Sequence, residues 1–178
     1  MCDMRIRIMF SKISMSERRI TFALVLNILS ILLLIATTII VIVRYNMLPA
    51  DAQVPTHWGA SGEADAWSGK GSLFVPLALA YFMCLITMPL SFMKPYEMLN
   101  MPGTLKERAF AKNPVAFNNT VRGFTAVMSF TVVLVFSWSA IASSFQLQLG
   151  IWFLPVVILL VVVPFVALIV RLVLIARG

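Results

Sequence analysis

The chain has 178 residues, of which 61% are hydrophobic and 12% are charged, and its formal net charge is +7. Because soluble domains carry about 25% charged residues, this composition excludes a soluble domain and indicates an integral membrane protein. The positive charge needs no nucleic-acid partner, since attraction of one membrane face to anionic lipid accounts for it. We therefore expect the lipid bilayer to be the first partner of this protein.

Four long apolar runs are expected to cross the membrane as helices. They cover residues 20–43, 72–93, 123–145 and 151–175. None contains an acidic residue, and each has about the 20 residues that cross roughly 30 Å of hydrocarbon. Continuous apolar runs satisfy their backbone groups in lipid only as helices, whereas the strands of membrane barrels alternate apolar and polar residues. The sequence therefore predicts an all-α integral membrane protein with four transmembrane helices.

The basic residues predict the orientation of these spans, because short cytoplasmic segments keep an excess of lysine and arginine. The tail 1–19 and the loop 94–122 are rich in both, so we place them inside, together with the end 176–178. The loop 44–71 has more acidic than basic residues and the loop 146–150 has no charge, so we place both outside. The prediction is a multi-pass protein of the bacterial inner membrane with cytoplasmic N- and C-termini.

Two further features lie in the second half of the chain. The residues from Thr104 to Glu107 resemble a helix capping box, which predicts a short helix over 105–112. In the third span, small residues recur at helical spacing at Ser137, Ala140 and Ser144, so another helix can approach this face closely. Packing within one four-helix bundle is the simpler interpretation, and a homo-oligomer or another membrane protein on this face is the alternative.

The loop between the first two spans is the one polar, turn-rich segment flanked by two apolar runs, and it holds the single histidine, His57. Its prolines favour extended backbone, its glycines permit turns with positive φ, and Glu63 and Asp65 can accept hydrogen bonds from backbone amides. These features predict a structured extracytoplasmic loop that folds into a compact cap over the helices.

Two other interpretations of this loop stay open. His57, Glu63 and Asp65 are metal-ligand types within reach of one turn, although their spacing specifies no metal and the acids can instead pair with nearby basic groups. Recognition of an external peptide or lipid head group is the other interpretation, with Trp58 and Trp67 as anchors.

An enzyme is the least favoured class. The sequence has no second histidine, no nucleophile motif on the outer face and no paired carboxylates on a helix. General acid–base catalysis needs such groups in fixed geometry. We therefore expect no catalytic residue and no cofactor, and a metal-dependent membrane enzyme stays as the weakest hypothesis.

The order of residues in the loop resembles a known family. Pro49 is followed by VPTHW at 54–58, by GEADAW at 62–67 and by Lys70, directly after the first predicted membrane helix. This order resembles the extracytoplasmic segment of SdpI-like bacterial membrane proteins, in which a Pro-x-His-aromatic step precedes a Gly-Glu-x-Asp turn and a following Trp and Lys. The binding residues that the resemblance implies are Pro55, His57, Trp58, Gly62, Glu63, Asp65, Trp67 and Lys70.

The resemblance also implies a class of function. The named member of the family is an immunity protein that protects its cell from a secreted toxic peptide and signals inward to a transcriptional repressor. We therefore expect a small membrane protein that binds an extracellular peptide in immunity, envelope stress or signalling. The alternative is a structural or accessory subunit whose helices pack against another membrane protein.

Overall fold

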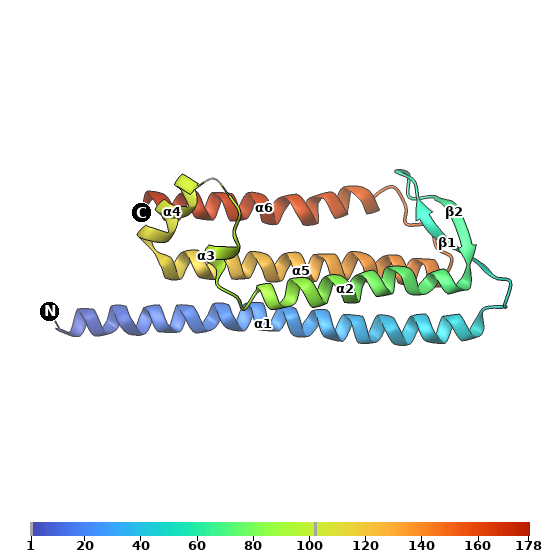
Figure 1. Ribbon diagram of the computed structural model, residues 1–178, viewed down its shortest axis with the longest axis horizontal. Coiled ribbons are helices and arrows are strands. Elements are labelled where there is room, and N and C mark those ends of the chain that lie inside the picture. The colour runs from blue at the N-terminus through green and yellow to red at the C-terminus, as the bar shows by residue number, and fades with distance from the viewer. Residues whose placement is uncertain (1, 102) are drawn as a thin grey trace.

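The computed structural model describes the backbone of residues 2–101 and 103–178, and the side chains from residue 22 onward except at 98 and 102. In this part of the chain, four helices are long and apolar enough to cross a membrane. They lie side by side in an elongated bundle, with a small β-hairpin at one end and two short helices at the other (Figure 1). The prediction of four apolar helical spans is confirmed.

The four long helices are α1 (Cys2–Met47), α2 (Phe74–Leu90), α5 (Pro114–Ser144) and α6 (Phe153–Arg177). They differ from the predicted limits: α1 is longer at both ends, α5 begins earlier and α6 ends later, whereas α2 lies within its predicted range. The third span was predicted to begin at residue 123, but α5 already begins at Pro114. Its start is fixed by the preceding Asn113, whose side chain accepts a hydrogen bond from the Ala116 amide at 3.0 Å. Hydropathy misses this polar first turn because capping residues are not apolar.

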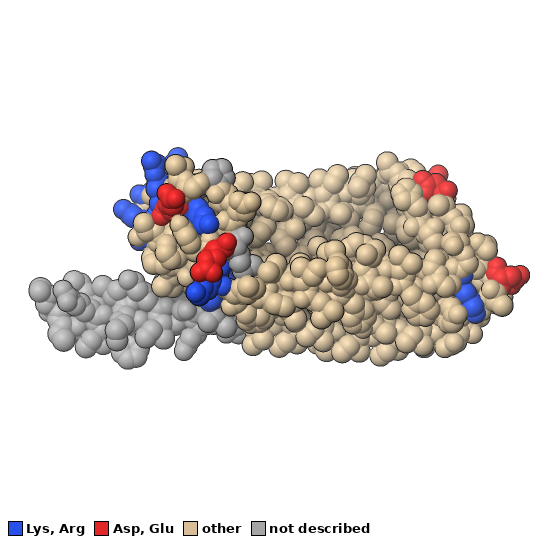
Figure 2. All heavy atoms as spheres, in the orientation of Figure 1, with Lys and Arg blue, Asp and Glu red and all other residues tan. Residues whose placement is uncertain are grey.

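Two short helices connect α2 to α5, and both lie at the end of the bundle where the chain begins and ends (Figure 1). They are α3 (Pro95–Met98) and α4 (Gly103–Lys112). The predicted helix over 105–112 is therefore present and begins slightly earlier. Lysine and arginine side chains gather at this end, which we call the α4 end (Figure 2).

The central helix is α5, which lies between α1 and α2 on one side and α6 on the other (Figure 1). Its contacts with α2 include a hydrogen bond of 2.7 Å from the Thr87 hydroxyl to the Ser129 hydroxyl. Ser137, Ala140 and Ser144 are 1%, 0% and 0% exposed, and Ala140 packs in a cluster with Val41 of α1. The small residues of the third span are thus buried within one chain, as the bundle-packing interpretation expects.

Helix α6 is the least covered of the four. Leu168 and Leu172 are its buried residues, and both pack at the α4 end. Most of its apolar surface is left uncovered by the rest of the chain, which suits a helix surrounded by hydrocarbon.

Candidate functional site

The loop between α1 and α2 folds as an antiparallel hairpin of β1 (Gln53–Trp58) and β2 (Ala64–Gly69). The turn is closed by two backbone hydrogen bonds of 2.9 Å, from the Gly59 amide to the Glu63 carbonyl and from the Gly62 amide to the Gly59 carbonyl. The register shifts on both sides of His57, which indicates a bulged strand. The predicted structured loop is therefore present, but the all-α prediction missed this two-stranded sheet.

Gly62 has a backbone position that no other residue fits well. Its φ is +79°, and a Cβ built on it would lie 2.2 Å from the carbonyl oxygen of Gly150. The Gly62 carbonyl accepts a hydrogen bond of 2.8 Å from the Leu149 amide. Glycine is needed here both for the left-handed conformation and for the close approach of the loop between α5 and α6.

The loop between α5 and α6 is joined to the hairpin by hydrogen bonds that involve side chains. Trp58 Nε1 donates to the Leu147 carbonyl at 3.1 Å, and Gln148 Oε1 accepts from the Ala64 amide at 2.6 Å. Gln146 Nε2 donates to the Gln53 carbonyl at 2.9 Å. Sequence patterns assign no role to these glutamines. Their one signal is that both lie in a short loop predicted to be on the same side of the membrane as the hairpin.

The base of the hairpin is joined to the bundle. The Ser143 hydroxyl of α5 donates to the Pro55 carbonyl at 2.5 Å. Val54 is fully buried in a cluster with Val41, Leu73, Leu77 and Ala140. The hairpin therefore packs as a cap on this end of the bundle, which we call the hairpin end.

Lys70 binds backbone carbonyls at the end of α1. Its Nζ donates to the carbonyls of Tyr45 and Leu48 at 3.2 Å and 2.9 Å, and it lies 4.5 Å from the centre of the Tyr45 ring. A cation at a helix C-terminus satisfies free carbonyls and opposes the negative end of the helix dipole. The acids of the loop could pair with Lys70 or with His57; Asp65 lies beside His57, and Lys70 binds these carbonyls instead.

The three candidate metal ligands are not brought together. His57 Nδ1 lies 2.5 Å from Asp65 Oδ1, and their side chains are 69% and 53% exposed. Within the described residues, no group of three His, Cys, Asp or Glu side chains could hold a metal ion. Glu63 therefore supplies no third ligand, and the arrangement is an exposed hydrogen-bonded pair of His57 and Asp65 across the two strands.

A cavity of about 560 Å³ lies beneath the hairpin, between it and helices α2, α5 and α6. Half of the candidate binding residues line it, namely Pro55, His57, Trp58 and Gly62. The other half, Glu63, Asp65, Trp67 and Lys70, lie outside its lining. Four of the eight candidate residues therefore form one wall of this cavity.

The remaining walls come from helices that are distant in sequence. They include Val75 and Leu79 of α2, Phe136 and Ser139 of α5, and Leu154 of α6. Nearly all of these are apolar, so the cavity suits an apolar group. The polar side chains in its lining are those of Thr56, His57, Ser72, Ser139 and Ser143. Val75, Leu79 and Leu154 also stay 58%, 40% and 45% exposed, so the chain does not seal this space on the membrane-facing side.

Comparison with known proteins adds one match. Residues 32–80 match the model of a family described as a domain of unknown function, DUF1648. The matched segment covers the second half of the α1 span, the whole hairpin, Lys70 and the first turns of α2. No curated protein and no solved structure matches the chain significantly.

Proposed function

We propose that this chain is a multi-pass inner-membrane protein that binds an extracellular peptide in the cavity beneath its hairpin. The biological setting we propose is SdpI-like: immunity to a toxic peptide, envelope stress or signalling. The observation that carries the proposal is that Pro55, His57, Trp58 and Gly62, selected as candidate binding residues from the loop sequence, form one wall of a 560 Å³ apolar cavity.

The charge distribution supports an outward-facing hairpin. Lysine and arginine side chains gather at the α4 end (Figure 2), and short cytoplasmic segments carry such an excess. An even number of spans puts both chain ends on this side. The cavity then opens toward the outer leaflet, where an amphipathic peptide arrives from outside the cell.

The chemistry of the cavity favours binding over catalysis. Its apolar walls can take up leucine-like or aromatic side chains of a peptide, and burial of such groups contributes about 1.5 to 3 kcal/mol each. The His57 imidazole at the cavity wall is oriented by Asp65 and can hydrogen-bond a polar group of the ligand. Trp58 is held in place by its bond to Leu147, so this wall is organised before any ligand arrives.

A cavity-filling variant tests this proposal. Leu79→Trp puts an indole into the cavity, whereas Ile86→Trp puts the same group on an exposed part of α2 that does not line it. We expect cells without the gene to become sensitive to at least one toxic peptide in a broad panel. Ile86→Trp should restore protection and Leu79→Trp should not. Unchanged sensitivity of the deletion strain across the panel would remove the immunity proposal.

A second pair of variants separates a binding site from a purely structural cap. His57→Ala and Asp65→Asn should leave the amount of folded protein in the membrane unchanged while reducing protection, because both side chains are mostly exposed. Loss of folded protein in both variants would favour the cap alone.

The alternative is an accessory subunit of another membrane protein. It is favoured by the long uncovered apolar surface of α6. Copurification decides between the two functions, since a stoichiometric membrane partner supports the accessory role and a monomer or homodimer supports the peptide-binding role.

A further inference from the structure

A second cavity lies toward the other end of the bundle. It has a volume of about 410 Å³ and runs between α5 and α6, with Phe22 of α1 at its edge. Asn119 and Arg171 line it toward the α4 end, whereas Val127 and Val163 line it toward the middle of the bundle. Because a helix rises about 1.5 Å per residue, its polar and apolar ends are roughly 12 Å apart. The cavity is therefore amphiphilic along the direction of the membrane normal.

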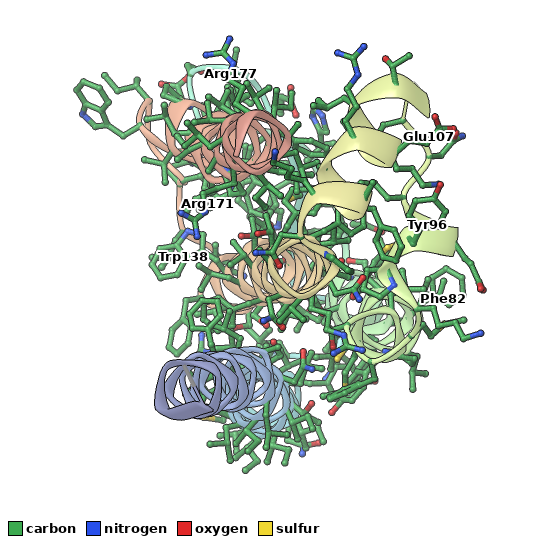
Figure 3. The ribbon with its side chains drawn as sticks, turned by 90° about the vertical axis from the view of Figure 1, so that its left-hand side faces the viewer. Phe82, Tyr96, Glu107, Trp138, Arg171 and Arg177 are labelled. Carbon is green, nitrogen blue, oxygen red and sulfur yellow. The ribbon has the colours of Figure 1, made fainter. Side chains whose placement is uncertain are left out.

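Arg171 puts a permanent positive charge on an otherwise apolar stretch of α6. Its side chain projects from α6 into the space beside α5, whereas Arg177 projects away from the bundle (Figure 3). The ion pairs among described side chains involve His57 with Asp65 and Lys94 with Glu97, and none of them includes Arg171. A guanidinium among apolar side chains is costly in hydrocarbon without an anion or water beside it. Its surroundings therefore favour an anionic group.

Asn119 is a second polar residue at the same end of this cavity. It is 6% exposed, and it lines the same cavity as Arg171. The hydrogen bonds among the described side chains include none from Asn119, whereas the neighbouring Thr120 hydroxyl donates to the Ala116 carbonyl at 2.8 Å. A buried carboxamide carries two N–H donors and a carbonyl acceptor, and these match the oxygens of a phosphodiester and its glycerol.

We propose that this groove binds one anionic phospholipid. Its phosphate is bound by Arg171 and Asn119, and one acyl chain lies along Val127 and Val163. The groove has free space beside Gly123, where an added Cβ would come no closer than 4.0 Å to Phe22. The gathering of lysine and arginine at the same end (Figure 2) raises the local concentration of anionic lipid. A lipid supplies charge and an apolar chain together, as the two ends of the groove require.

Native mass spectrometry of the full chain tests this site. The chain is purified in detergent and incubated with phosphatidylglycerol or with phosphatidylcholine of the same acyl chains. We expect one phosphatidylglycerol to be retained in preference to phosphatidylcholine. Arg171→Gln should weaken that retention about tenfold, which corresponds to about 1.4 kcal/mol. Arg177→Gln removes the same charge from the same helix outside the groove and should leave retention unchanged.

A second variant addresses the apolar end. Ala167 lines the groove, so Ala167→Trp should displace the acyl chain and weaken retention while Arg171 stays in place. This variant also keeps the proposal testable if Arg171→Gln fails to fold. Equal retention of the two lipids, or equal loss with Arg177→Gln, would overturn the site. Displacement of the lipid by millimolar inorganic phosphate would also overturn it, because the groove would then recognise free phosphate.

Discussion

The two ends of the bundle are held together by different kinds of contact. At the hairpin end, directional hydrogen bonds join residues far apart in sequence, such as Ser143 with Pro55 and Gln146 with Gln53. At the α4 end, Tyr96, Phe110 and Phe117 form an aromatic cluster with ring centres 4.6 to 6.1 Å apart. Hydrogen bonds fix position and orientation, whereas apolar packing fixes mainly volume.

This difference predicts where substitutions are tolerated. The α4 end should accept changes that keep apolar volume, and the hairpin end should accept few changes at the residues that make its specific bonds. Each end also carries a cavity, neutral beneath the hairpin and cationic between α5 and α6. The two ends are therefore suited to different ligands.

The largest effect on the free energy of unfolding is expected from a substitution at the α4 end. Phe117 is fully buried and contacts both Tyr96 and Phe110, so Phe117→Ala should lower the free energy of unfolding by about 3 to 5 kcal/mol. Val115→Ala, at a 41% exposed position of the same turn, is the control. The free energies of unfolding of both variants are measured in mixed micelles. A cost below about 1 kcal/mol for Phe117→Ala would mean that packing does not hold this end.

The next largest effect is expected from a substitution that strains the backbone at the hairpin end. Gly62→Ala forces a side chain into positive φ and against Gly150, and strained backbone of this kind costs about 1 to 3 kcal/mol. Gly69→Ala is the matched control, because Gly69 has a φ of −58° and open space around it. Proteolysis of the hairpin should accelerate in the first variant alone. Equal protection of both would show that the loop at Gly150 moves aside freely.

A smaller effect is expected at the junction of α1 and the hairpin. Lys70→Met keeps the apolar stem and removes two bonds to the α1 carbonyls, so it should destabilise the fold by about 1 to 2 kcal/mol. Lys94→Met, at an 83% exposed side chain, should change little. Thermal unfolding in detergent compares them, and equal midpoints would contradict the capping role of Lys70.

The smallest effect is expected at the exposed contact between His57 and Asp65. His57→Ala should change the free energy of unfolding by less than about 1 kcal/mol, because exposed pairs contribute little. The same thermal unfolding measures it. A larger loss would make this pair part of the structural cap, in contrast to its proposed role at the cavity wall.

The spans could be predicted from sequence because transfer of each residue to lipid depends mostly on that residue alone. The hydrogen-bond partners of the hairpin could not be predicted from sequence. The bonds that involve Gln148 and Gln146 join residues that are 84 and 93 positions apart in the chain. The family-like loop identified Pro55, His57, Trp58 and Gly62, but the opposite wall at Leu79 and Phe136 became visible only in the fold. The start of α5 at Asn113 was not predicted, because hydropathy does not detect polar N-cap residues.

The long separation of the hairpin contacts has a consequence for biogenesis. The ribosome makes α1, the hairpin and α2 first, and the glutamines that hold the hairpin come only after α5. Until Gln146 and Gln148 reach the hairpin, the Gln53 carbonyl and the Ala64 amide lack their final partners. The hairpin end is therefore completed last, and a chain truncated before residue 146 would present an unfinished cap.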